Sequence, residues 1–293
     1  MKRPRILLAV ALFSVSTSSV FARFLPEVPA IVIGIWRMLF AAGILWSFSG
    51  FRRLGKLSPS SYGSILIAGV FLGIHFACYF GALKYTSVAA ATFLSTTAPI
   101  FTVVIEHVFL KRPWKAHIIV GVFLALLGAL VVQFSFMSGF SKYMIGNALG
   151  VAASICMTIV LMLAEKIRKT EDALVYSRSM YLVAGLILIP IAVILDQPLF
   201  SYSIVEYRWL LLLGLIPTVI GHTSFYYAIK WWPPTIVASV PLGEPILASL
   251  WAWFFFAEIP TLSIAGGGLF ILTGLFIITL RQPSTNEFQS DII

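Results

Sequence analysis

One acidic side chain lies in the middle of a long apolar segment of the chain. Glu244 belongs to the stretch Pro241-Leu-Gly-Glu-Pro245, inside an apolar run over 235–256. An ionised carboxylate at the centre of a bilayer costs ~2.5 kcal/mol or more, so it normally faces a cavity or a partner. Each flanking proline removes a helix hydrogen bond and exposes a carbonyl, as in interrupted helices that bind ligands. We expect Glu244 to bind a ligand or exchange protons; the alternative is a structural hydrogen bond to a neighbouring helix.

Two histidine–tyrosine pairs occur in the two halves of the chain. His75 and Tyr79 are four residues apart, and so are His222 and Tyr226. This spacing places each pair on one face of a helix. We expect the pairs to line opposite walls of one cavity. The alternative is that each histidine satisfies a neighbour inside a helix bundle.

Other polar or aromatic side chains within apolar runs also need an explanation. Arg37 lies too deep for its charge to reach the interface, so we expect an acidic or carbonyl partner and a structural role. Trp251 is seven residues after Glu244, on the same helix face, and is expected to line the cavity. Three groups near basic clusters are expected to form interfacial ion pairs: Glu106, His107 and Glu165.

The composition determines what kind of element must hold these residues. Hydrophobic residues make up 60% of the 293, and charged residues only 11%. A soluble domain carries roughly 25% charged residues, so this chain has too little polar surface to hydrate and must face lipid. The net charge of +9 is distributed between apolar runs and not along a basic helix face, which argues against nucleic-acid binding.

Ten apolar segments each approach the ~20 residues that cross a bilayer. They predict an all-α, polytopic membrane protein with ten transmembrane helices. The N-terminal segment has features of a signal peptide, but we interpret it as the first spanning helix because removing it would leave nine. The expected spans are 6–24, 29–50, 62–84, 87–109, 114–136, 144–165, 175–195, 207–229, 235–256 and 262–280, followed by a polar cytoplasmic tail over 282–293.

The basic residues predict the orientation of the chain. With the N-terminus in the cytoplasm, fourteen lysines and arginines fall on the cytoplasmic side and four on the outer side. This distribution predicts a protein of the cell (inner) membrane with both termini in the cytoplasm. The inside group is Lys2, Arg3, Arg5, Arg52, Arg53, Lys56, Lys111, Arg112, Lys115, Lys166, Arg168, Lys169, Lys230 and Arg281. The outside group is Arg23, Lys84, Lys142 and Arg208.

The two halves of the chain share their proline and glycine positions. A shift of 146 residues superposes Lys84 on Lys230, Pro99 on Pro245, Gly121 on Gly267 and Gly128 on Gly274. We therefore expect two five-helix repeats, over 1–143 and 144–281. Because five is odd, the second repeat is inverted in the membrane, an arrangement typical of secondary transporters.

These residues resemble a known family. The stretch Gly221–Gly274 is similar to the second repeat of EamA-type members of the drug/metabolite transporter superfamily. Trp36-Arg37, Thr97-Ala98-Pro99 and the glycines at 121 and 128 resemble the first repeat. The resemblance implies ten helices around a cavity lined mainly by helices one, three, four, six, eight and nine. It also implies export of amino acids, other metabolites or drugs.

The chain departs from the family pattern at one position. The resemblance implies a glutamate just after helices four and nine. Glu258 occupies this place in the second half, but Lys111-Arg112 occupies it in the first. A role for a symmetric pair of these acids is therefore not expected.

These patterns favour a secondary transporter, expected to export amino acids or related small metabolites by alternating access. Its expected partners are the lipid bilayer, a small-molecule substrate and, as candidate coupling ions, protons. No paired aspartates, His-rich metal box or G-x-x-x-x-G-K-[ST] loop occurs, so we expect neither an enzyme nor a metal, a cofactor or direct use of ATP. The alternatives are an exchanger of organic phosphates or sugar phosphates, anchored by Lys84 and Lys230, and a membrane assembly protein without transport.

Overall fold

The structure is a computed structural model, and it describes residues 2–51, 55–86, 88–113, 115–134, 144–257, 259 and 262–280. Within these ranges the chain is helical and contains no strand. The predicted tail over 282–293, the predicted external loop over 138–142 and Glu258 lie outside the described residues.

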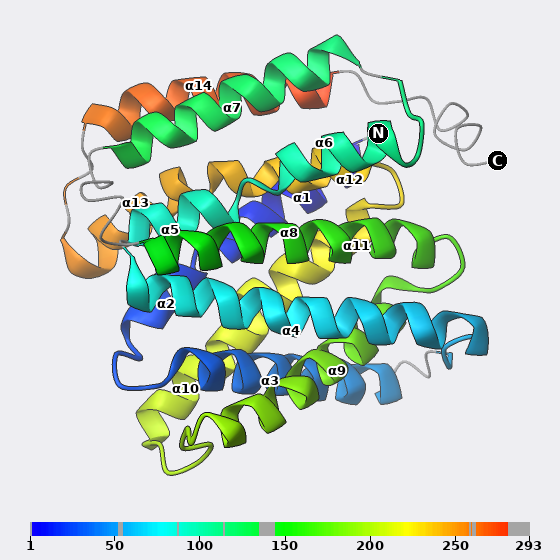
Figure 1. Cartoon of the computed structure of the whole chain (residues 1–293), viewed down its shortest axis with the longest axis vertical. Helices are drawn as coiled ribbons and strands as arrows, with labels where there is room; N and C mark the ends of the chain where they lie inside the picture. The colour runs from blue at the N-terminus through cyan, green and yellow to red at the C-terminus, as the bar shows by residue number, and fades with distance from the viewer. Residues whose placement is uncertain are drawn as a thin grey trace.

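Each half of the chain forms a series of antiparallel helices, several of which are interrupted (Figure 1). The first half contains α1 (Lys2–Val15), α2 (Ser18–Arg23), α3 (Ala30–Phe51), η1 (Pro59–Ser61), α4 (Tyr62–Tyr85), α5 (Val88–Ser95), α6 (Ala98–Val108) and α7 (Ala116–Phe134). The second half contains α8 (Met144–Ile167), α9 (Ala173–Ile194), α10 (Ile204–Leu213), η2 (Gly214–His222), α11 (Thr223–Ala228), α12 (Pro234–Ser239), η3 (Val240–Gly243), α13 (Glu244–Phe256) and α14 (Leu262–Leu280).

Eight helical segments of the described chain are long and apolar enough to cross a membrane, which confirms a multi-pass membrane protein. Each coincides with a predicted span. The other two predicted spans fall on α7 and α14, whose apolar parts, 116–131 and 265–279, are shorter than the other eight. Ten spanning helices therefore stay a prediction. The eight segments are Arg5–Arg23, Ala30–Ser49, Pro59–Tyr85, Ala91–Val108, Met144–Ile167, Ala173–Ile194, Ile204–Ala228 and Pro234–Phe256.

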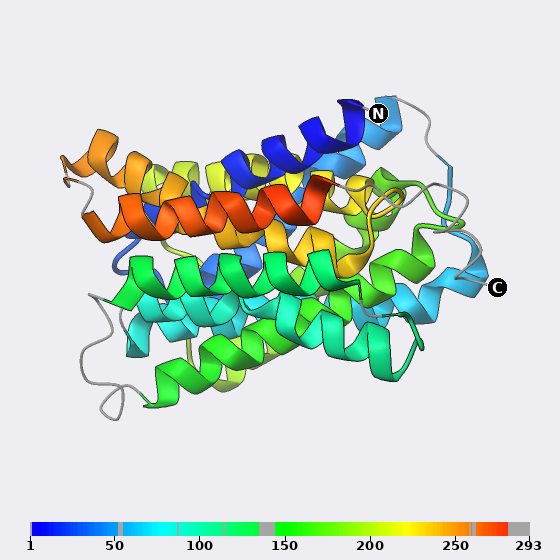
Figure 2. The ribbon, with the colours of Figure 1, turned by 90° about the horizontal axis from the view of Figure 1, so that it is seen from above.

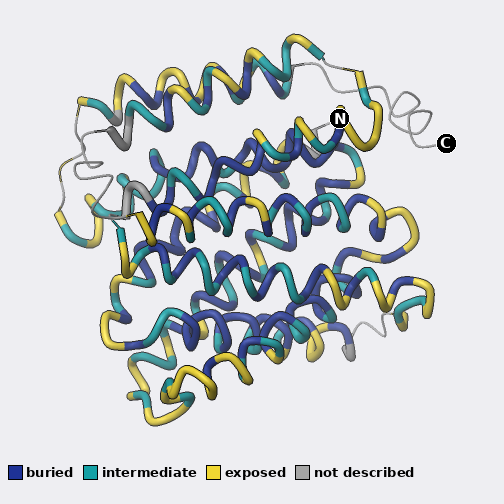
Figure 3. Tube along the Cα trace, viewed as in Figure 1, coloured by how far each residue is buried: buried dark blue, intermediate teal, exposed yellow. Residues whose placement is uncertain are grey.

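The outside of the bundle is apolar, as a lipid-facing surface requires. Exposed residues follow the outer faces of α7 and α14 in Figure 3, and they include Phe123, Leu269 and Phe276. Buried positions include many serines, threonines and charged groups, among them Arg37 and Glu244. Polar side chains thus gather inside the bundle, where helix neighbours can satisfy them.

The connections that are rich in basic residues lie at one end of the bundle. Figures 1 and 2 show the α6–α7, α8–α9 and α11–α12 connections at the same end as the N-terminus. There the Ser58 backbone N–H donates to Glu171 Oε1 at 3.0 Å. Arg5 donates from Nη2 to the Thr279 carbonyl at 3.1 Å, so the start of α1 lies beside the end of α14. This shared end is the one that the charge distribution predicts to be cytoplasmic.

Two spanning segments are interrupted at equivalent places in the two halves. Between α5 and α6 the helix is broken at Thr96 and Thr97, and before α13 it tightens into the 3₁₀ turn η3. Pro99 lies in the first turn of α6, two residues after Thr97, and Pro241 lies within η3. Because proline has no N–H, each removes a helix hydrogen bond and leaves a carbonyl to be satisfied elsewhere. The proline pattern therefore correctly predicted the interruption beside Glu244.

A glycine seam joins α7 to α14, which lie together at one edge of the bundle in Figure 1. A Cβ added to Gly121 would lie 2.7 Å from the Gly274 carbonyl oxygen, and one added to Gly128 would lie 2.5 Å from that of Gly267. Only glycine allows two backbones to approach this closely. We call these four residues the glycine seam.

Candidate functional site

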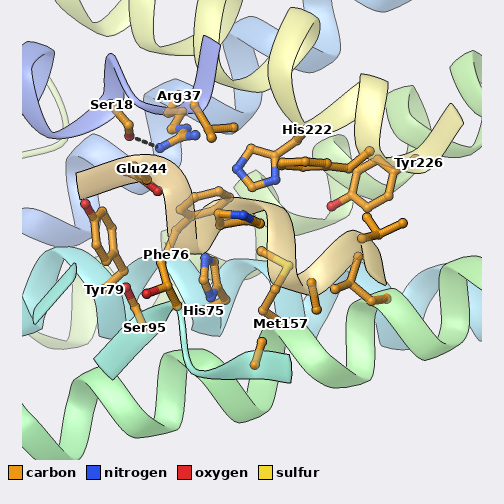
Figure 4. A pocket seen from close by; sticks show the side chains of 18 residues that line it. Ser18, Arg37, His75, Phe76, Tyr79, Ser95, Met157, His222, Tyr226 and Glu244 are labelled. Atoms are coloured by element: carbon orange, nitrogen blue, oxygen red, sulfur yellow. Dashed lines mark hydrogen bonds between the residues drawn. The ribbon is translucent and has the colours of Figure 1, made fainter. Parts of the chain in front are cut away.

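A cavity of about 70 Å³ lies where the interrupted helices meet. Its polar lining is Ser18, Arg37, His75, Tyr79, Ser95, Thr96, His222, Tyr226 and Glu244. Its apolar lining is Val15, Phe76, Ala98, Met157, Leu161, Phe225, Val237, Ala238 and Pro241. Figure 4 shows Arg37, Glu244 and Tyr79 gathered at one end, with His222 and Tyr226 at the other. Five of the six predicted site residues therefore line one cavity.

Arg37 is the cation of this cavity, and it is 1% exposed. Its Nε donates to Thr218 Oγ1 at 2.7 Å, and its Nη1 donates to Ser18 Oγ at 2.8 Å (Figure 4). The guanidinium carbon lies 4.2 Å from the centre of the Phe76 ring, close enough for a cation–π interaction. Hydroxyl groups are the direct hydrogen-bond partners of Arg37, and the expected acidic partner is Glu244, which interacts with the guanidinium electrostatically without a close ion pair. The second helix also contributes to the cavity wall, which the family resemblance did not imply.

The partner of Arg37 on the opposite helix owes its position to a π-helical segment. Pro217 lies inside η2 and has no N–H to donate to the Leu213 carbonyl one turn earlier. The Thr218 hydroxyl donates to that carbonyl instead, at 2.8 Å, while it accepts from Arg37. Such π-helical turns are frequent at functional sites. Sequence reasoning missed this residue because a threonine in an apolar run has no distinguishing periodicity.

Glu244 is the anion of the cavity, and it begins α13 directly after η3. The side chain is 8% exposed and accepts no hydrogen bond from another described residue. It interacts electrostatically with Arg37, although no hydrogen bond or close ion pair joins them in the described part of the chain. The expected alternative, a structural hydrogen bond to a neighbouring helix, is therefore absent among the described residues.

The first predicted histidine–tyrosine pair lies on the α4 wall of the cavity. His75 Nδ1 donates to the Ala153 carbonyl at 2.8 Å, since a carbonyl can only accept. That bond leaves Nε2 as the second ring nitrogen, an acceptor when the ring is neutral. The Tyr79 hydroxyl lies near the Thr92 side chain but makes no hydrogen bond of good geometry to a described residue.

The second pair lies across the cavity on η2 and α11. The His222 ring packs edge-on against Phe76, with ring centres 5.5 Å apart, and is fixed by no hydrogen bond from the described residues. The Tyr226 hydroxyl is buried and also has no partner there. Unpartnered buried hydroxyls are costly, so these groups are suited to hydrogen-bond a ligand.

Trp251 does not line this cavity, so that prediction was wrong. Its Nε1 donates to Ser16 Oγ at 2.9 Å, and its ring meets Phe13 edge-on at 5.0 Å. Seven residues of α-helix advance by about 10.5 Å, which carries the indole beyond the cavity even though it shares a helix face with Glu244.

A charged cluster closes the expected cytoplasmic end. Arg112 forms ion pairs with Glu165 at 2.7 Å and with Glu106 at 3.4 Å. Glu106 Oε1 also accepts the Thr235 backbone N–H at 3.2 Å, at the start of α12. The predicted ion pairs of Glu106 and Glu165 are confirmed. His107 Nδ1 donates to the Arg112 carbonyl at 3.1 Å, and an ion pair of His107 stays a prediction. We call Glu106, Arg112 and Glu165 the charged latch.

A second, larger cavity of about 220 Å³ lies at the other end of the bundle. Lys84 and Arg23 contribute to its lining together with Phe80. Lys84 is exposed and donates to the Pro26 carbonyl at 3.2 Å. Lys230 is exposed and lines neither of these cavities. The described residues contain no group of three or more metal-binding side chains.

Comparisons with known proteins agree on the kind of protein. A family model described as "EamA-like transporter family" matches residues 3–134 and again residues 144–280. An "Uncharacterized transporter" of Archaeoglobus fulgidus is 25% identical over 289 residues, which cover 96% of this chain and 98% of the relative. Solute carrier family 35 member G1 of Mus musculus is 24% identical, over 92% of this chain and 76% of that protein.

A solved structure extends the likeness to the fold. That crystal structure superposes with a TM-score of 0.82 over 96% of this chain and 97% of the other, at 17% identity. At this identity the match shows a shared fold.

Proposed function

The chain belongs to the EamA-like transporter family, and from this we propose that it is a secondary transporter that carries a small metabolite through the cavity around Glu244 by alternating access. One observation carries the proposal. Arg37 and Glu244, two oppositely charged and buried side chains, face the same cavity within spanning segments. Charges at this depth are retained for function far more often than for stability.

Two features support an inverted repeat, on which alternating access depends. Under the shift of 146 residues, the break at Thr96 and Thr97 corresponds to the last two residues of η3. The glycine seam is self-complementary: Gly121 meets Gly274, and Gly128 meets Gly267. Since Gly121 corresponds to Gly267 and Gly128 to Gly274 under the shift, the two-fold axis of an inverted repeat would exchange these two contacts. The family model also matches the two halves separately, near the proposed repeat boundaries of 1–143 and 144–281.

The placement of the latch and of the larger cavity supports a route for export. The charged latch joins the halves at the end predicted to be cytoplasmic. The larger cavity occupies the other end, and Phe80 contributes to its lining while its ring centre lies 5.9 Å from the Arg37 guanidinium. A ligand leaving the central cavity outward would pass this ring. We propose export toward that side.

The organic-phosphate alternative loses its anchors in this geometry. It needs Lys84 and Lys230 to face the ligand, but neither lines the central cavity. A membrane assembly protein would not need two opposed charges and several unpartnered hydroxyls around one cavity. Transport of a small metabolite therefore explains more of the residues that line the cavity than either alternative does.

Radiolabel uptake into everted membrane vesicles tests this function. Vesicles containing the protein should accumulate at least one compound from a panel of amino acids, phosphorylated metabolites and organic cations, above vesicles that lack it. Uptake should fall when Glu244 is replaced by alanine, provided that the variant reaches the membrane in equal amount. If no compound of any class accumulates and none exchanges, the transporter function is wrong.

A further inference from the structure

One nitrogen of the buried arginine is left without a partner. Arg37 Nε and Nη1 are each fixed by a hydroxyl group, but Nη2 is buried and makes no hydrogen bond to a described residue. A buried donor on a charged group is costly when unsatisfied, more so than a neutral one. The guanidinium is therefore held in place on two sides and lacks an acceptor on the third.

The position of Glu244 shows that it is not that acceptor. Its carboxylate interacts electrostatically with Arg37 at the same end of the cavity (Figure 4), but no direct hydrogen bond or ion pair joins the two. Apart from two histidines, Arg37 and Glu244 are the charged residues among those that line the cavity. The positive charge of the arginine and the negative charge of the carboxylate cancel. A bound molecule that carries both charges would satisfy both side chains without leaving net charge in the membrane.

We propose, resting on the proposed transport function, that Arg37 and Glu244 form a clamp for a small zwitterion. Arg37 binds its carboxylate through Nη2, and Glu244 binds its ammonium group. The serine and threonine hydroxyls of Ser18 and Thr218 position Arg37 for this contact. The lining also includes apolar side chains, with Phe76, Met157 and Phe225 available to a hydrocarbon body.

The clamp also explains which ligands the cavity should reject. A dianion such as a sugar phosphate would place two negative charges against one arginine and beside a glutamate. A simple organic cation would pair with Glu244 but leave Arg37 Nη2 unsatisfied and repelled. Buried unpaired charges discriminate strongly, since each must be desolvated without compensation.

A matched ligand series tests the clamp in the purified full-length protein. The probes are L-leucine, L-leucinamide, 4-methylpentanoate and glucose 6-phosphate, with the corresponding series for L-alanine and L-phenylalanine. The readouts are thermal stabilisation in detergent and counterflow in proteoliposomes. We expect at least one zwitterion to bind, and its amide and deaminated forms to bind at least about tenfold more weakly, because each loses a charge-assisted pair.

Two substitutions should exchange the preferences in opposite directions. Glu244→Gln removes the repulsion against a lone carboxylate, so 4-methylpentanoate or its homologue should now bind. Arg37→Gln removes the repulsion against a lone amine, so the amide should now bind. Lys230→Gln is the matched control: it removes an exposed cation that lines neither cavity and should leave all ligand preferences unchanged.

The outcomes separate the clamp from transport itself. If wild-type protein transports a compound that lacks either charged group as well as its zwitterionic form, transport stands and the clamp is wrong. Unchanged zwitterion affinity in Arg37→Gln also overturns it. If Arg37→Gln does not fold, the wild-type series and Glu244→Gln decide the question alone. If no probe and no compound of the vesicle panel is transported, the proposed function fails and the clamp fails with it.

Discussion

Arg112 and Glu165 are joined by a 2.7 Å ion pair that connects the segment after α6 to the C-terminal part of α8. The arginine comes from the first half of the chain and the glutamate from the second. Through Glu106 the same arginine is connected to the start of α12, which leads to the cavity-lining residues of η3 and α13. Under the proposed alternating access, opening the cavity toward this end would require these contacts to separate.

Weakening this pair should open the cavity toward the basic end. We expect Arg112→Gln to increase the rate at which a cysteine at position 226 reacts with a water-soluble thiol reagent added from that side, by several-fold. Loss of the pair removes a buried charged contact between the two halves at this end. Labelling would be compared in inside-out and right-side-out vesicles. An unchanged rate from both sides would show that the charged latch does not control access.

Cavity access gives a second prediction. In a background free of Cys78 and Cys156, cysteines at positions 79 and 226 should both react with a water-soluble thiol reagent, because both tyrosines line the cavity. A transported substrate should protect both. A cysteine at position 176 is the control, since Tyr176 is fully buried outside the cavity. Two unreactive cavity positions would assign these side chains to packing.

Thr218 should matter more than an ordinary threonine in a membrane helix. Thr218→Val keeps the shape but removes the acceptor for Arg37 and the donor for the Leu213 carbonyl. We expect the free energy of unfolding to fall by about 1–3 kcal/mol, measured by denaturant unfolding in detergent, because a buried charged donor becomes unsatisfied. Thr279→Val, which removes only hydrogen bonds within α14, should change it by less than about 0.5 kcal/mol.

Glu244 should couple transport to pH. Glu244→Gln keeps size and hydrogen bonding but cannot exchange a proton, so we expect folded, inserted protein that loses most pH-driven uptake yet retains exchange between two substrate pools. The comparison is pH-driven uptake against homoexchange in proteoliposomes. Wild-type rates and wild-type pH dependence in both assays would exclude Glu244 as the coupling group and favour a pH-independent facilitator.

The topology can be tested without a substrate. Reporter fusions should place residues 52–58 and 166–172 in the cytoplasm and residues 138–142 outside. The contact between Ser58 and Glu171 supports the first two sharing a side, and so does the donation from Arg178 Nη2 to the Gly55 carbonyl at 2.7 Å. Finding 52–58 and 138–142 on one side would contradict the inverted repeat.

Much of the architecture could be predicted from the sequence, because a bilayer requires each spanning segment to be helical, apolar and about 20 residues long. The length of each apolar run predicted the eight spanning segments, and the prolines around Glu244 predicted the interruption before α13. The i, i+4 spacing predicted that Tyr226 and His222 would face one cavity, since helix geometry determines which residues share a face.

Contacts between distant segments could not be predicted in the same way. Arg37 and Thr218 are 181 residues apart, so the arginine's hydroxyl partner was not visible in any local pattern. The π-helical conformation of η2 could not be predicted from the sequence, because nearly every residue around it is apolar and shows no distinctive pattern. The prediction for Trp251 was wrong for a different reason. Its spacing from Glu244 predicted a shared helix face, but about two helical turns along α13 the indole contacts Ser16 and not the cavity.

The glycine seam has a consequence for how the halves can move. The proposed two-fold axis exchanges the Gly121–Gly274 and Gly128–Gly267 contacts, so the seam as a whole would be the same in both states and need not break when the halves exchange conformations. At the Gly121–Gly274 contact the two backbones are so close that no side chain fits between them, so neither helix can slide along the other without a clash. The α7–α14 pair is therefore suited to stay fixed while other helices move. A covalent cross-link between these two helices should leave the transport rate unchanged.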